Sequence, residues 1–265
     1  MTTLKRRTVT LLVSIMAVAL GSTAMAQVYT DPVGFAKVDA IAHGLTMVSV
    51  PLKAQDMQLN GAEGCIGDMI KEQMVGADDA FLGDSIFMWD AVNKKYSSLL
   101  LCGEIGDPAY DGKWLDASTF DVSTLTLAVG DAFWIARPGA TTAQITFLGW
   151  VPMEETREVT LYSGLTMFAW PYPTILPLNT STLGQVGRGG IGAGAADMVW
   201  RWNADTQDYT AAFLISGWGA LYDGKWWDET AGKFSNIEFE PGAGFWYLRR
   251  GDTIIWNCRR PYPRL

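Results

Sequence analysis

The chain carries the same short motifs twice, in the same order. The segment Gly44–Pro51 (GLTMVSVP) returns as Gly164–Pro171 (GLTMFAWP), and Tyr110–Asp116 (YDGKWLD) returns as Tyr222–Asp228 (YDGKWWD). Ordered internal repetition is the sequence signature of repeated structural units, and it constrains the fold before any single residue does. It also changes how a conspicuous residue is interpreted, because a residue that occurs twice is better explained by the fold than by one active site.

The motifs divide the chain into two copies of one β-rich unit, with predicted boundaries at residues 27–152 and 153–265. The sequence has 28 Gly and 12 Trp but only 18% charged residues, which suits strands joined by tight turns. We predict an all-β fold class, mainly antiparallel sandwich-like or barrel-like units in a tandem internal repeat. A minor short helix is expected over Ile66–Met74, where apolar residues recur at helical spacing. Glycine-rich Thr182–Ala195 takes its place in the second copy and predicts a loop.

Residues 1–26 have the features of a secretory signal peptide. Lys5, Arg6 and Arg7 precede an apolar stretch, and Ala24-Met25-Ala26 supplies a small-residue cleavage pattern. The apolar stretch is shorter than the ~20 residues of a membrane-spanning helix. We therefore expect cleavage before Gln27, no membrane span afterwards, and a secreted, periplasmic or cell-surface location.

The charge balance narrows the range of partners. The net charge is −8, and loss of the three basic residues of the signal peptide leaves 17 Lys and Arg against 28 Asp and Glu, or −11. Such a surface repels phosphate backbones and anionic lipids, so nucleic acid is not an expected partner. Cationic ligands, divalent ions and neutral glycans remain open.

The chain has three cysteines and one histidine. An oxidising compartment permits a disulfide, and Cys65 and Cys102 of the first copy are the candidate pair. Cys258 is then left over and is expected to be buried in a strand. With only His43 and no Cys-x-x-Cys, a cysteine-based zinc site is not expected.

Several landmarks resemble a known protein family. These are the opening Asp31–Phe35, the Trp89-Asp90…Tyr96 hairpin, and the strands Val129–Ile135 and Ile145–Val151. Together they are similar to the secreted paralogous proteins of planctomycete and verrucomicrobial bacteria. The resemblance covers most of the mature chain, and no catalytic residues can be carried over from it, because the family has no assigned activity.

The repeated YDGKW-x-D motif allows three interpretations. A sugar-binding platform would stack pyranose rings on tryptophans and hydrogen-bond hydroxyls to aspartates, using Trp114, Asp116, Trp226, Trp227 and Asp228. A calcium loop would use Asp107, Asp111 and Asp116. The favoured interpretation is structural, since Asp-Gly between aromatic residues predicts a two-residue type I′ hairpin turn with glycine at positive φ.

No nucleophile, metal or kinase motif occurs in the sequence. We therefore predict no enzymatic activity and no cofactor. The expected function is a secreted, non-catalytic structural or surface-interaction and assembly role, with self-association or a cell-surface protein as partner. The alternative is a carbohydrate- or ligand-binding module that binds a neutral glycan through exposed Trp and Asp of the motif. Solvent exposure of Trp114, Trp226 and Trp227 distinguishes the two.

Overall fold

Strands make up most of the regular structure. A computed structural model describes residues 31–79 and 82–263, with 42% strand and 6% helix. The predicted signal peptide lies outside the described residues. The sheets are antiparallel and the two α-helices are short, so the all-β prediction is confirmed.

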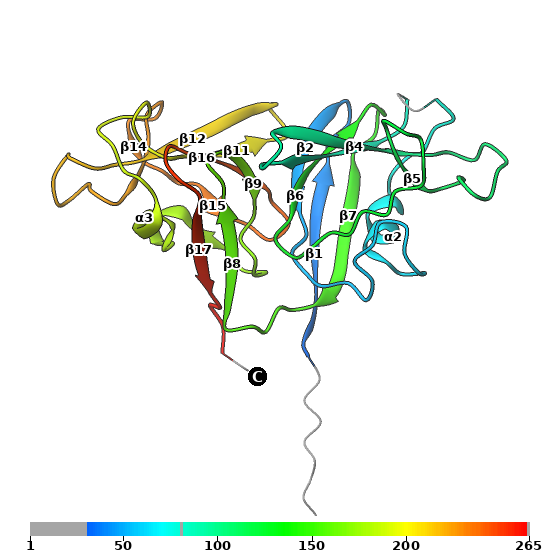
Figure 1. Cartoon of the computed structure of the whole chain (residues 1–265), viewed down its shortest axis with the longest axis horizontal. Helices are drawn as coiled ribbons and strands as arrows, with labels where there is room; N and C mark the ends of the chain where they lie inside the picture. Colours follow the sequence, from blue (N-terminus) through cyan, green and yellow to red (C-terminus); the bar gives the residue numbers. More distant parts are fainter. Residues whose placement is uncertain (1–30, 80–81, 264–265) are drawn as a thin grey trace, which may run out of the picture. The chain divides into compact units, whose positions relative to one another are not determined.

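The N-terminal half, residues 33–150, consists of a two-stranded ribbon, a five-stranded sheet and one helix (Figure 1). In the ribbon, β1 pairs with β7; in the sheet the order is β2-β6-β3-β4-β5. The elements are β1 (Val33–Ala40), β2 (Gly44–Ser49), α2 (Ile66–Lys71), β3 (Ser85–Asp90), β4 (Lys95–Leu101), β5 (Trp114–Asp116), β6 (Ala132–Arg137) and β7 (Ala143–Trp150). The inward faces of the ribbon and sheet enclose a hydrophobic core together with α2.

The C-terminal half, residues 156–259, has its own ribbon, β8 with β17, and a six-stranded sheet of order β14-β13-β12-β11-β16-β9. A further small ribbon joins β10 to β15. The elements are β8 (Thr156–Leu161), β9 (Gly164–Phe168), β10 (Leu176–Pro177), η1 (Leu178–Thr180), α3 (Leu183–Val186), β11 (Met198–Asn203), β12 (Asp208–Leu214), β13 (Trp226–Asp228), β14 (Lys233–Phe234), β15 (Glu238–Phe239), β16 (Phe245–Arg249) and β17 (Ile254–Arg259).

The two main sheets share one strand order. When the strands are matched through the repeated motifs, β2, β6, β3, β4 and β5 correspond to β9, β16, β11, β12 and β13, which neighbour one another in the same sequence. The ribbons also correspond, since the opening strand of each half pairs with its closing strand. The described residues from Pro32 onward nevertheless form one compact unit.

The two sheets meet through aromatic side chains on their outward faces. Trp89 of the N-terminal half contacts Trp246 of the C-terminal half, with ring centroids 5.8 Å apart and an interplanar angle of 74°. Trp202 contacts Trp134 in return, at 5.3 Å and 87°. Trp89 matches Trp202 and Trp134 matches Trp246 by position in the motifs, so the contact is reciprocal.

Hydrogen bonds across the same interface follow this pattern with one difference. The Trp89 indole Nε1 donates to the Leu165 carbonyl oxygen (2.9 Å), and the Trp202 indole Nε1 donates to the Leu45 carbonyl oxygen (2.7 Å). In addition, the Gln207 amide accepts from the Leu45 N–H (2.9 Å) and donates to its carbonyl (3.0 Å). Strand β2 is an edge strand, so Gln207 supplies an acceptor for the outward-facing Leu45 N–H and a second donor for the Leu45 carbonyl.

Each half also contains one buried ion pair at the same position. Arg137 pairs with Asp84, and Arg249 pairs with Asp197. Both carboxylates are almost fully buried and also accept backbone N–H groups. Burial of a charge is costly unless it is paired and hydrogen-bonded, so each pair is an integral part of its half.

Three local predictions need correction. The helix over Ile66–Met74 is shorter and ends at Lys71. The glycine-rich segment begins with a helical turn, α3, because Leu183 is buried in the core and holds it in place. Gly112 and Gly224 do adopt positive φ (64° and 80°). Their Asp-Gly turns are not type I′, which needs positive φ at both central residues, and the preceding aspartates are not among the positive-φ residues.

Candidate functional site

Trp114 and Trp226 of the repeated motif lie inside the protein. Trp114 on β5 is 0% exposed and Trp226 on β13 is 1% exposed. Each packs into the core of its own half. A ring without an exposed face cannot stack on a sugar, so the prediction that these two residues bind ligand was wrong. Strand alternation turns this position inward in both halves.

Trp227 follows Trp226 on β13 and therefore points to the opposite face, where it is half-buried. It meets Trp218 at 5.3 Å and 70°, and Phe234 at 5.6 Å and 86°. These are edge-to-face contacts, which suit aromatic packing. The rings therefore do not form the co-planar row that a sugar platform requires.

The aspartates of the motif organise turns. One oxygen of Asp116 accepts from the Ser118 N–H (2.8 Å) and hydroxyl (2.5 Å), and the pKa of Asp116 is lowered by these hydrogen bonds. The carboxylate of Asp228 accepts from the Ala231 N–H (2.9 Å). Asp111, proposed for a calcium loop, accepts from the Ile105 N–H (2.8 Å).

No group of three or more potential metal ligands comes together within residues 31–79 and 82–263. The cysteines do not pair either: Cys65, Cys102 and Cys258 are buried, free thiols. Cys65 precedes α2 with its Sγ 3.9 Å from the Leu59 carbonyl oxygen, whereas Cys102 follows β4 and hydrogen-bonds to Lys113. The possible Cys65–Cys102 disulfide is thus not formed in this structure.

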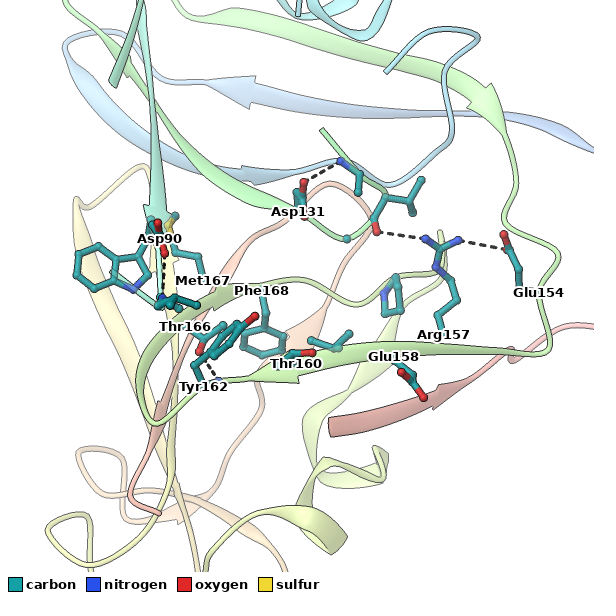
Figure 2. A pocket seen from close by; sticks show the side chains of 18 residues that line it. Asp90, Asp131, Glu154, Arg157, Glu158, Thr160, Tyr162, Thr166, Met167 and Phe168 are labelled. Atoms are coloured by element: carbon teal, nitrogen blue, oxygen red, sulfur yellow. Dashed lines mark hydrogen bonds and ion pairs between the residues drawn. The ribbon is translucent and has the colours of Figure 1, made fainter. Parts of the chain in front are cut away.

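A cleft of about 600 Å³ opens where the two halves adjoin (Figure 2). This volume lies within the range of small-molecule sites, ~300–1,000 Å³. Its walls come from the end of β3, the segment before β6, and strands β8 and β9. Trp89 and Phe168 supply apolar wall, while Asp131 and Arg157 supply charge.

The opposite side of the same junction is closed. There the Ser49 N–H donates to the Gly242 carbonyl oxygen (2.8 Å), and Val48 forms a β-bridge with Ala243. A Cβ placed on Gly242 would lie 2.5 Å from Val38 Cγ2, which shows how closely the halves approach. Gly130, the matching glycine, lines the open cleft instead.

The cleft is predominantly acidic. Asp90, Asp131, Glu154 and Glu158 line it, against the single cation Arg157. Arg157 is already engaged, with its guanidinium 3.2 Å from a Glu154 oxygen and 3.4 Å from the Val129 carbonyl oxygen (Figure 2). Burial raises the pKa of Asp131, although the Ala128 N–H donates to its carboxylate (2.7 Å) and opposes this. The lining includes no His, Cys or Ser.

A second surface feature lies on the outer face of the β1–β7 ribbon. Cross-strand pairing places Val33 opposite Trp150 and Phe35 opposite Leu148. These four side chains are 63%, 39%, 70% and 53% exposed. We call them the ribbon strip. Contiguous exposed apolar surface of this kind marks an interaction site more often than isolated apolar residues do.

The matching face of the C-terminal ribbon is mainly polar. The pair Thr156 and Arg259 occupies the place of Phe35 and Leu148, and Arg259 lies 3.8 Å from the exposed Glu155. The C-terminal ribbon therefore folds without apolar residues at the places of Phe35 and Leu148, although Ile255 is exposed further along the same face. The ribbon strip is not explained by the fold alone.

Sequence reasoning missed the ribbon strip, although a signal was present. Lys37 and Asp39 alternate with Ala36, Val38 and Ala40, and the charged residues must face solvent. Strand periodicity then assigns Val33 and Phe35 to the solvent face as well. The inner face uses small residues, which allow the ribbon to approach the core closely.

Within the described residues, no helix has the length and apolar character needed to cross a membrane. Comparisons with protein-family models, curated proteins and solved structures found no match to this chain.

Proposed function

We propose that this chain is a secreted, non-catalytic β protein with a surface-interaction or assembly role, and that the ribbon strip is its contact surface. The observation that carries the proposal is the difference between the two ribbons. Phe35 and Leu148 are exposed on one, while Thr156 and Arg259 occupy the same places on the other. Exposed apolar side chains that the fold does not require are best explained by a partner that covers them.

The proposal includes a tandem repeat, with residues 27–152 and 153–265 as its copies. The shared strand order of the two main sheets and the reciprocal aromatic contact support it. It also includes cleavage of residues 1–26 and membership of the secreted planctomycete and verrucomicrobial family that the landmarks resemble.

The fates of the motif residues support a non-catalytic role. Trp114 and Trp226 fill the cores, and Asp116 and Asp228 cap turns. The residues that occur twice thus have structural roles, leaving no repeated constellation for chemistry.

The experiment is co-sedimentation of the purified chain from Gln27 onward with the envelope fraction of the cells that secrete it. The test variant is Phe35→Thr with Leu148→Arg, which copies the residues of the C-terminal ribbon. The control is Leu221→Thr, since Leu221 is 83% exposed but lies away from the ribbon. We expect the ribbon variant to lose at least about tenfold in affinity, or ~1.4 kcal/mol, and the control to bind like the original chain. Equal binding by all three would contradict the assignment of the ribbon strip.

Ligand binding in the acidic cleft is the second candidate function. Its volume of about 600 Å³ and its excess of carboxylates favour a small molecule that carries a positive charge. Titration with spermidine, followed by isothermal titration calorimetry, tests this. Binding should weaken in Asp131→Asn, and an equal response to a neutral oligosaccharide would instead favour the glycan-binding alternative.

A further inference from the structure

We infer that the occupant of the ribbon strip is a second copy of this chain, so that the protein forms a two-fold dimer by packing the two strips face to face. This inference rests on the proposed function and names the partner for that surface.

The charge of the chain favours the strip over other surfaces for self-contact. At a net charge of −11 for the chain from Gln27 onward (17 Lys and Arg against 28 Asp and Glu), two copies repel each other over most of their surfaces. The ribbon strip contains no charged residue, and its first charged neighbour on the same strand is Lys37, a cation. Close approach of two copies is therefore least opposed at this place.

Geometry also allows the strip to cover itself. The strip consists of two adjacent cross-strand rows, Val33 with Trp150 and Phe35 with Leu148. A two-fold axis that lies in the plane of the interface, parallel to these rows and midway between them, turns the strip of one copy to face that of its partner and places each row on the other row. An isologous contact needs only one self-complementary patch, which a second copy supplies by symmetry. The reciprocal tryptophan contact inside the chain shows that faces of this fold pack against their own equivalents.

The size of the strip sets the expected strength. The exposed parts of the four side chains sum to on the order of 400 Å² per copy, given ~150–250 Å² for a whole aromatic side chain. Stable interfaces bury about 800 Å² per partner. The contact is therefore expected to form a weak, reversible dimer and not a permanent one. Trp150 is held in position for it by two backbone hydrogen bonds with Lys53 (2.9 and 3.1 Å).

Sedimentation equilibrium of the chain from Gln27 onward tests the inference. The concentration series should run from about 1 µM to about 1 mM, the range over which complexes of micromolar to millimolar affinity dissociate. We expect a reversible monomer–dimer equilibrium for the original chain and for Leu221→Thr. The variant Phe35→Thr with Leu148→Arg should remain monomeric throughout. Its fold is checked by near-ultraviolet circular dichroism, and Phe35→Thr alone, with an intermediate dissociation constant, provides a milder second test.

The outcomes separate this inference from the proposed function. A monomeric original chain at every concentration, or a ribbon variant that dimerises as strongly as the original, would overturn the self-contact. If the original chain is monomeric but the ribbon variant still loses envelope binding, the strip binds a different molecule and the proposed function stands. If neither property changes in the variant, both proposals are wrong.

Discussion

Removal of Arg249 provides a direct test of the buried ion pairs. Its guanidinium lies 2.6 Å from Asp197, whose side chain is 0% exposed. In Arg249→Met the carboxylate stays buried without its counter-charge, and loss of one partner of a buried pair typically costs about 3–5 kcal/mol. Asp197 keeps hydrogen bonds from the N–H groups of Arg188 and Arg250 and from the Tyr247 hydroxyl, each 2.7 Å. These remaining donors place the expected loss near the lower end, about 3 kcal/mol.

A double-mutant cycle shows whether the pair acts as a unit. Asp197→Asn removes the charge but leaves an NH₂ group among donors, and should also cost about 3 kcal/mol. The double variant should lose only about 4 kcal/mol, because after the first change the second removes little that remains. The assay is urea unfolding at pH 7, with the slope of the transition checked for each variant.

The matched control combines Arg249→Met with Asp84→Asn of the other half. Asp84 pairs with Arg137 and has no ion pair with Arg249, so the two losses should add within about 0.5 kcal/mol. The reasoning is refuted if Arg249→Met and Asp197→Asn also add within that margin, since the carboxylate would then not depend on the guanidinium.

Three further outcomes are expected. Gly224→Ala should lower the free energy of unfolding in urea by about 1 kcal/mol, because alanine resists the φ of 80° and nothing lies within 4 Å of the added Cβ to contribute a clash. Gly224→Asn should lower it by less. Equal stability of the original chain and both variants would contradict the argument. Trp202→Phe should lower the free energy of unfolding by about 1–2 kcal/mol, since it removes the indole donor to the Leu45 carbonyl. A loss no larger than that of a distant, exposed Tyr→Phe control would mean that this hydrogen bond between the halves does not stabilise the protein. The raised pKa of Asp131 means that the folded state holds the proton of this carboxyl group more tightly than the unfolded state does. The ionised Asp131 therefore opposes folding at pH 7, and this effect disappears as the pH falls through the folded pKa. Asp131→Asn, which can still accept from the Ala128 N–H, should be more stable than the original chain at pH 7 but not at pH 3.

Strand positions were readily predictable because they depend on local alternation. The strands expected within Val129–Ile135 and Ile145–Val151 overlap β6 (Ala132–Arg137) and β7 (Ala143–Trp150). The helix at Ile66 was found by its periodicity, but its end was not, since no glycine or proline marks the stop at Lys71.

The candidate site was less predictable because it depends on which face a strand presents. Trp226 and Trp227 are neighbours of one residue type, yet only Trp226 is fully buried, and packing of the sheet decides this. The cleft beside Gly130 depends on how two halves approach, and Gly242 at the matching position is closed off. Contacts between segments far apart in the chain carry no local signal, so neither outcome could be derived from one sequence.

The difference between the two ribbons has a consequence for the valence of assembly. A chain with an adhesive strip on both ribbons could bind a neighbour at each end, and successive additions would produce an open filament. Phe35 and Leu148 form the proposed contact on one ribbon, while Thr156 and Arg259 occupy their places on the other, where Ile255 is the exposed apolar residue of the paired strands. With the proposed self-contact, each chain has one such strip, and growth terminates at the first pairing. If the two halves were separate, identical chains, any change in sequence would alter both ribbons at once. Because they are parts of one continuous chain, one ribbon can differ from the other.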